Sequence, residues 1–326
     1  MTAPSIPNAP GRPAPAGSST TALAGVGDLQ RRPDTRGSLF RFGLLSSLLV
    51  TLLVLVTLLV QVLYDSWPVL TTRLGEFLTT GLGSRPEVSG IAQGLRGTFY
   101  VCLIVALVAF PLGIGAAVYL EEYAAKSRLT RFIDINIRNL AGVPSVVYGI
   151  LGLTIFVKGP VIGSLTGGST PLAAGLTLSA LVLPVVIITS AEALRSVPQP
   201  LKEAGYGVGA TKWEVIKDHI LPYAAPGILT GTLLSIARAA GEAAPLILVG
   251  TTTGFLTNIP SWWDVSQVRE RFTAMPIIIT TWARRPQEGF KVEMAAAAIV
   301  ILILFVVLLN SAAILLRNRY EKRRQA

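Results

Sequence analysis

The chain has 326 residues, of which 51% are hydrophobic and 14% charged, and its formal net charge is +10. The charged share is about half that of an average soluble domain. Long apolar runs account for this composition, which excludes an ordinary soluble class and favours an α-helical membrane protein. The single cysteine, Cys102, lies in an apolar run, and the single histidine, His219, has no companion ligands. A disulfide framework and an imidazole metal site are therefore not expected.

Six apolar runs predict an all-α polytopic membrane domain with six transmembrane helices over residues 39–316. The expected spans cover about residues 42–63, 98–120, 140–157, 171–190, 225–250 and 294–316. Residues 1–38 are rich in Pro, Ala, Gly, Ser and Thr and predict a disordered N-terminal tail. Residues 317–326 form a basic C-terminal tail.

Charge along the chain predicts the orientation of these spans. Lys and Arg are concentrated before the first span, between the second and third, between the fourth and fifth, and after the sixth. If six spans alternate, all four segments fall on one side, so both termini are expected in the cytoplasm. The loop 251–293 has nearly balanced charge and is expected outside. Its tryptophans are expected at the membrane interface or in a small external cap, namely Trp262, Trp263 and Trp282.

The segment 198–222 interrupts the apolar runs but keeps a helical pattern, which predicts a helical hairpin between two spans. Its prolines stop the preceding helix, and a short helix is expected over Leu201–Tyr206 with Glu203 in its first turn. The stretch Thr211–Glu214 fits a capping box and predicts the start of a second helix. One face of that helix is expected to carry Trp213, Ile216 and Ile220.

Two charges fall inside the fifth expected span. Arg238 and Glu242 lie four positions apart, so their side chains can meet on one helix face near the middle of the membrane. Ionisable groups at this depth are costly and often mark a substrate path. In one interpretation Arg238 guides an anion and Glu242 holds it in place. In the other, the two form a structural ion pair that fixes helix packing.

The segment 198–222 resembles the EAA loop of ABC-importer permeases, which reads Glu-Ala-Ala-x-x-x-Gly and ends in Ile-x-Leu-Pro, and after this resemblance we call it the coupling hairpin. Five positions match at the correct spacing: Glu203, Ala204, Gly209, Leu221 and Pro222. Two positions depart from the pattern, because Gly205 replaces the second Ala and His219 stands where Ile is usual. The resemblance implies that this loop, including Trp213, forms cytoplasmic coupling helices that dock on an ATPase subunit.

Further stretches resemble the permeases of the phosphate-specific transport system, of the PstA type. They are residues 142–152 (GVPSVVYGILG), 238–246 (RAAGEAAPL), 273–276 (TAMP) and 282–287 (WARRPQ). The resemblance covers about residues 95–316 and implies the type I ABC-importer permease fold in a bacterial inner membrane. It also implies a second, PstC-like permease, a PstB-like ATPase dimer that holds ATP and Mg²⁺, and a PstS-like external phosphate-binding protein.

These features predict a non-catalytic permease subunit of an ATP-driven phosphate importer, with no cofactor in this chain and no nucleic-acid partner. The sequence carries no phosphate-loop motif of its own, so any ATP hydrolysis belongs to a partner. One alternative is a permease for another oxyanion, such as molybdate or sulfate. A second alternative, a secondary transporter that works alone, would need coupling-ion residues and internal repeats.

Overall fold

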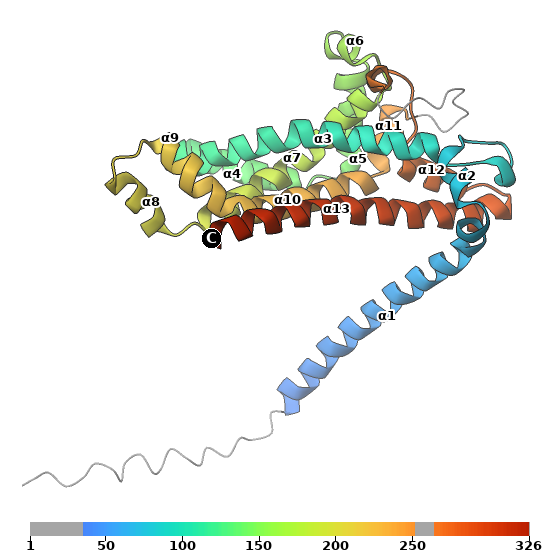
Figure 1. Ribbon diagram of the computed structural model, residues 1–326, viewed down its shortest axis with the longest axis horizontal. Coiled ribbons are helices and arrows are strands. Elements are labelled where there is room, and N and C mark those ends of the chain that lie inside the picture. Colours follow the sequence, from blue (N-terminus) through green and yellow to red (C-terminus); the bar gives the residue numbers. More distant parts are fainter. Residues whose placement is uncertain (1–34, 252–263, 326) are drawn as a thin grey trace, which may run out of the picture. The chain divides into compact units, whose positions relative to one another are not determined.

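The computed structural model describes residues 35–251 and 264–325 (Figure 1). The chain divides into two compact units, Met1–Thr57 and Leu58–Ala326. Helix α1 (Thr35–Thr72) begins in the first unit and ends in the second. It starts at Thr35, inside the expected N-terminal tail 1–38, and residues 1–34 of that tail lie outside the described residues.

Four long apolar helices form the centre of the second unit. They are α3 (Ala92–Val118), α7 (Pro171–Arg195), α10 (Leu221–Gly241) and α13 (Ala295–Gln325). In Figure 1 they lie side by side, with α7 in contact with α3 and α10, and α10 in contact with α13. Glycine permits the close approach: a Cβ on Gly231 of α10 would lie 2.2 Å from Oγ1 of Thr189 in α7. Small residues at helix contacts are typical of membrane bundles.

Shorter helices join these four or pack around them. They are α2 (Leu74–Thr79), α4 (Arg128–Ala141), α5 (Ser145–Gly152), α6 (Ile162–Thr166), α8 (Gln199–Gly207), α9 (Lys212–Glu214), α11 (Ala244–Val249) and α12 (Met275–Trp282). Two 3₁₀ turns cover Pro86–Val88 and Val265–Arg269. Four π-helical turns cover Tyr119–Tyr123, Leu153–Val157, Val215–Ile220 and Gly289–Met294. In Figure 1, α8 and α9 lie at one end of the bundle and α12 at the opposite end.

The third expected span, residues 140–157, begins later than predicted. Helix α4 ends at Ala141, and the chain bends by 99° before α5, which continues through a π-helical turn to Val157. Pro144 causes the break, because its ring disfavours helical backbone angles at the preceding residue. Within the described residues, five helices are long and apolar enough to cross a membrane, or six if this bent pair is one span.

The fifth expected span, residues 225–250, is also wrong as a single helix. Helix α10 ends at Gly241, and α11 begins at Ala244. Pro245 explains the interruption, because it has no N–H to donate to the carbonyl of Gly241 and its ring would collide with that group. At the other end the helix extends further than predicted, since an unbroken run of 30 helical residues covers Lys212–Gly241.

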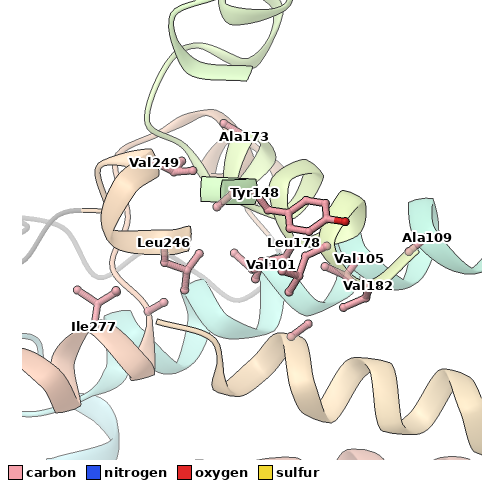
Figure 2. Packing of buried hydrophobic residues seen from close by; sticks show 14 of the residues in the cluster. Val101, Val105, Ala109, Tyr148, Ala173, Leu178, Val182, Leu246, Val249 and Ile277 are labelled. Carbon is pink, nitrogen blue, oxygen red and sulfur yellow. The ribbon is translucent and has the colours of Figure 1, made fainter. Parts of the chain in front are cut away.

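Three buried clusters hold the second unit together. The first joins α3, α5, α7, α10, α11 and α12, and it includes Leu178, Tyr148 and Leu246 (Figure 2). The second lies at the α12 end, where Trp282 packs against Phe77 and Phe290 with ring centroids 6.3 and 5.6 Å apart. Trp282 is therefore part of a buried cap, whereas Trp262 and Trp263 lie outside the described residues.

Candidate functional site: the coupling hairpin and the α10–α11 break

The third buried cluster lies beneath the coupling hairpin. Val215, Ile216 and Ile220 of the π-helical turn are completely buried, packing against the C-terminal end of α7. The α8 backbone approaches this turn closely, because Gly205 is buried against Val215. The hairpin is thus packed onto the bundle through a buried core that it shares with α3 and α7.

The capping box that opens the second hairpin helix is confirmed. The Thr211 hydroxyl oxygen accepts from the Glu214 backbone N–H at 3.4 Å, and the Thr211 N–H donates to Oε2 of Glu214 at 2.7 Å. The first hairpin helix starts earlier than predicted, because Pro198 is its N-cap and Gln199 its first residue. Glu203 consequently lies beyond the first turn of α8, where it is exposed.

Trp213 does not share the buried face of Ile216 and Ile220, so that prediction is wrong. The Trp213 side chain is 56% exposed, whereas both isoleucines are fully covered. The π-helical turn that starts at Val215 changes the angular spacing between these positions, since its hydrogen bonds span five residues. Trp213 is left on the outside of the hairpin with Tyr206 and Val208, which are 45% and 84% exposed.

The matched positions of the EAA pattern occupy defined places in this geometry. Glu203 and Ala204 lie on the exposed surface of α8, and Leu221 and Pro222 begin α10. Gly209 lies between α8 and α9 with φ of +86°, a left-handed conformation that side chains with a Cβ rarely adopt. The reversal of the chain therefore depends on glycine at this position.

The expected contact between Arg238 and Glu242 is present, but its location differs. Nε of Arg238 lies 3.3 Å from Oε1 of Glu242. Arg238 is in the last turn of α10, and Glu242 is the C-cap residue in an extended conformation. The cation therefore lies at a helix C-terminus, where the helix dipole favours positive charge. The two side chains remain 42% and 20% exposed, which leaves the guanidinium accessible.

The break between α10 and α11 is itself a functional signal. Irregular backbone at membrane depth is tolerated only where it is buried in protein or lines a water-filled cavity. The partly open ion pair at Glu242 places the break at a polar surface. Among the described residues, no three His, Cys, Asp or Glu side chains are arranged to hold a metal ion.

Sequence reasoning missed a set of interactions that attach the hairpin to the bundle. Glu121 and Glu122, at the end of α3, pair with Arg195 and Lys202. The available signal was the acidic pair itself, which directly follows a long apolar run and precedes a strongly basic segment. Its partners lie 74 and 80 positions away along the chain, so no local pattern identifies them.

A bundle of apolar helices with a packed, polar helical hairpin at one end defines a multi-pass membrane protein of the permease class. Residues 109–325 match the family described as "Binding-protein-dependent transport system inner membrane component". The chain belongs to this family of ABC-transporter inner-membrane permeases.

Several curated relatives were found for this chain. It is 36% identical over 193 residues to "Probable ABC transporter permease protein YqgI" of Bacillus subtilis, a match that covers 59% of this chain and 64% of the relative. It is 39% identical over 208 residues to "Phosphate transport system permease protein PstA 1" of Mycobacterium tuberculosis, covering 63% of this chain and 65% of the relative. The matched region thus spans slightly under two thirds of each of these relatives. Identity is 33% to PstC 2 of M. tuberculosis, over 67% of this chain and 74% of the relative.

Solved structures show the same fold at low sequence identity. The bacterial alginate ABC transporter, in complex with an alginate-bound periplasmic protein, matches with a TM-score of 0.61 at 13% identity, over 85% of this chain and 93% of that one. The inward-facing MetNI methionine ABC transporter matches with a TM-score of 0.52 at 17% identity, over 72% and 96%. The type I ABC-importer permease fold expected from the sequence is confirmed.

Proposed function

We propose that this chain is a permease subunit of an ATP-driven phosphate importer, in which it forms part of the phosphate path and receives its driving force from separate ATPase subunits. The observation that carries the proposal is the coupling hairpin, which presents an exposed surface on a buried base. The phosphate assignment rests on the relatives of M. tuberculosis, which are described as phosphate transport permeases.

The geometry of the hairpin suits the transmission of force from a docked subunit. Exposed Trp213 and Val208 offer apolar contact area, and aromatic residues of this kind are enriched at the centres of protein interfaces. Glu203 adds an exposed charge on α8. Because Ile216 and Ile220 anchor the same hairpin in the bundle, a push on its surface moves packed helices and not a loose loop.

The proposal requires several partner subunits, because this chain forms part of the path while the ATPase subunits supply the driving force. ATP and Mg²⁺ belong to the ATPase dimer, which docks on the hairpin, and the hairpin end of the bundle together with both termini therefore faces the cytoplasm. A second, PstC-like permease completes the path, and an external PstS-like protein delivers phosphate at the α12 end. ATP binding favours the outward-open state by its differential affinity for the two states, and hydrolysis resets the path.

Arg238 and Glu242 are the proposed path residues in this chain. The guanidinium is partly open and lies at an interruption between α10 and α11, where a polar surface at membrane depth is tolerated. A planar guanidinium presents several donors in a fixed geometry that matches a phosphate group. Glu242 keeps the side chain oriented when no anion is present.

Purification of the tagged chain from its native membrane tests the subunit composition. We expect an ATPase subunit and a second permease to copurify. The purified complex, reconstituted in vesicles, is expected to take up radiolabelled phosphate only with ATP and the external binding protein. Uptake of molybdate or sulfate in place of phosphate would correct the substrate, and uptake without ATP would overturn the proposed class.

A further inference from the structure

Three consecutive residues at the end of α3 contact three different segments of the hairpin end. They lie in the π-helical turn Tyr119–Tyr123, which continues α3 beyond Val118. Turns of this kind are rare and frequently occur at functional sites. We call Glu121, Glu122 and Tyr123 the α3 clasp.

The first two clasp contacts are ion pairs. Glu121 receives two hydrogen bonds from Arg195, the last residue of α7, from Nε to Oε2 at 2.9 Å and from Nη2 to Oε1 at 2.5 Å. Glu122 receives a hydrogen bond from Nζ of Lys202 in α8, with a distance of 2.6 Å to Oε1. Lys202 directly precedes Glu203, the first matched position of the EAA pattern.

The third clasp contact reaches the other half of the hairpin. Nζ of Lys212, the first residue of α9, lies 4.8 Å from the centre of the Tyr123 ring. A cation over an aromatic face at this distance is attracted by the ring. The clasp therefore contacts both hairpin helices and the end of α7.

The two ion pairs of the clasp differ in how deeply their side chains are buried. The side chains of Lys202 and Glu122 are only 18% and 7% exposed, whereas that of Arg195 is 46% exposed. Removing one partner of a buried pair leaves an uncompensated charge in a poor solvent, so it has a much larger effect than removing an exposed partner. The pair Glu122–Lys202 is accordingly the strong link of the clasp.

Helix α8 has little other attachment to the bundle. Within the described residues, its main packing partner is the π-helical turn Val215–Ile220 of its own hairpin. That turn packs against the ends of α3 and α7, and α8 follows α7 after a short connection, so apolar contacts and the chain itself already carry part of a force on α8 to the bundle. The clasp adds direct polar links from both hairpin helices to the end of α3, and from there to α7, the two helices most closely packed against each other.

We propose that the α3 clasp is a positioning element for energy coupling: it makes α3 and α7 move with the hairpin when an ATPase subunit acts on it. This inference rests on the proposed function, because it requires an ATPase that docks on the hairpin. Glu122 and Lys202 do not contact ATP or substrate in this role. They determine how much of the hairpin's movement is transmitted to α3 and α7.

The test uses the complete complex in vesicles, with ATP hydrolysis measured with and without the external binding protein and phosphate uptake measured in parallel. In Glu122→Gln and Lys202→Met, we expect the stimulation of ATP hydrolysis by the binding protein to fall at least about fivefold. Coupling between two sites of a protein typically changes affinity by about fivefold or more. Basal hydrolysis and copurification of the subunits should be unchanged. The exchanged pair Glu122→Lys with Lys202→Glu should recover a large part of the stimulation, because it restores opposite charges.

Matched variants separate this role from a purely structural one. Lys217→Met removes an exposed hairpin lysine whose partner, Asp218, is 3.9 Å away, and it should leave stimulation unchanged. Lys212→Met removes only the exposed contact with Tyr123 and should assemble normally with a smaller loss of stimulation.

Two outcomes overturn the clasp and leave the proposed function intact. One is native stimulation in both Glu122→Gln and Lys202→Met. The other is loss of assembly in both variants together with native stimulation in Lys212→Met, which would show a folding role alone. Absence of ATP-dependent phosphate uptake by the unaltered complex would instead overturn the proposed function itself.

Discussion

The imidazole ring of His219 lies against Gly205, so that a Cβ atom on Gly205 would come 3.3 Å from Cδ2 of the ring. These are the two positions at which the hairpin departs from the EAA pattern. The departures are therefore neighbours: the loss of a methyl group on α8 accompanies the exchange of an isoleucine for a histidine on the facing turn. Both departures from the pattern therefore fall on one packing contact between α8 and the turn Val215–Ile220.

Restoring the alanine of the pattern should destabilise this hairpin. In Gly205→Ala the new Cβ would lie 2.9 Å from Cγ2 of Val215, which is β-branched and completely buried. Overpacking of this kind costs about 1–3 kcal/mol, and we expect a lower melting temperature of the purified complex. Gly207→Ala is the matched control, because no atom lies within 4 Å of its Cβ. Equal melting temperatures for the two variants would contradict the close packing.

The chain reversal at Gly209 gives a second prediction. At φ of +86° an alanine is strained by about 1–2 kcal/mol, whereas asparagine tolerates the left-handed region better. Stimulation of ATP hydrolysis by the binding protein should therefore decrease from Gly209 to Gly209→Asn to Gly209→Ala. Because no atom lies within 4 Å of the new Cβ, any loss reflects backbone strain and not a collision. Indistinguishable activity in all three proteins would show that the turn tolerates a different backbone path.

The sequence predicted the apolar helices better than their interruptions. Hydropathy responds to side chains and carries no information on whether the backbone stays helical. The presence of a proline does not by itself predict an interruption, since Pro111 and Pro184 lie inside the continuous helices α3 and α7. Before Pro144 and Pro245, in contrast, the preceding helices end at Ala141 and Gly241, and both prolines belong to the matched phosphate-permease segments. The difference depends on whether neighbouring helices satisfy the freed carbonyls, which only the packed structure decides.

The candidate site shows the same division between local and long-range information. The capping box at Thr211 was predictable, because both of its hydrogen bonds form within three residues. The exposure of Trp213 was not, because it depends on a π-helical turn that follows it. The pair of Glu122 and Lys202 joins residues 80 positions apart, and hydrophobic periodicity has no bearing on such a contact.

Trp213 provides a direct test of the docking surface. Its side chain is 56% exposed, so Trp213→Ala removes little buried contact within this chain and should not change its folding. Truncation of an aromatic residue central to an interface typically costs about 2 kcal/mol or more, and we expect weaker retention of the ATPase subunit during purification. Trp67→Ala is the control, since Trp67 is 60% exposed and lies in α1, outside the hairpin. Equal retention of the ATPase in the two variants would exclude Trp213 from the interface.

A variant of Arg238 tests whether this residue belongs to the phosphate path or only to a structural ion pair. Its pair with Glu242 is 42% and 20% exposed, and a pair open to this degree contributes only about 0–1 kcal/mol to stability. Arg238→Gln should therefore assemble and melt like the native complex, yet it should lose most phosphate uptake because the anion loses its charged partner. Arg138→Gln is the matched control, because Arg138 makes a pair of the same spacing with Asp134, at 3.1 Å and with 41% and 38% exposure. Native uptake by a well-assembled Arg238→Gln complex would show that the pair serves only to hold the end of α10 in place.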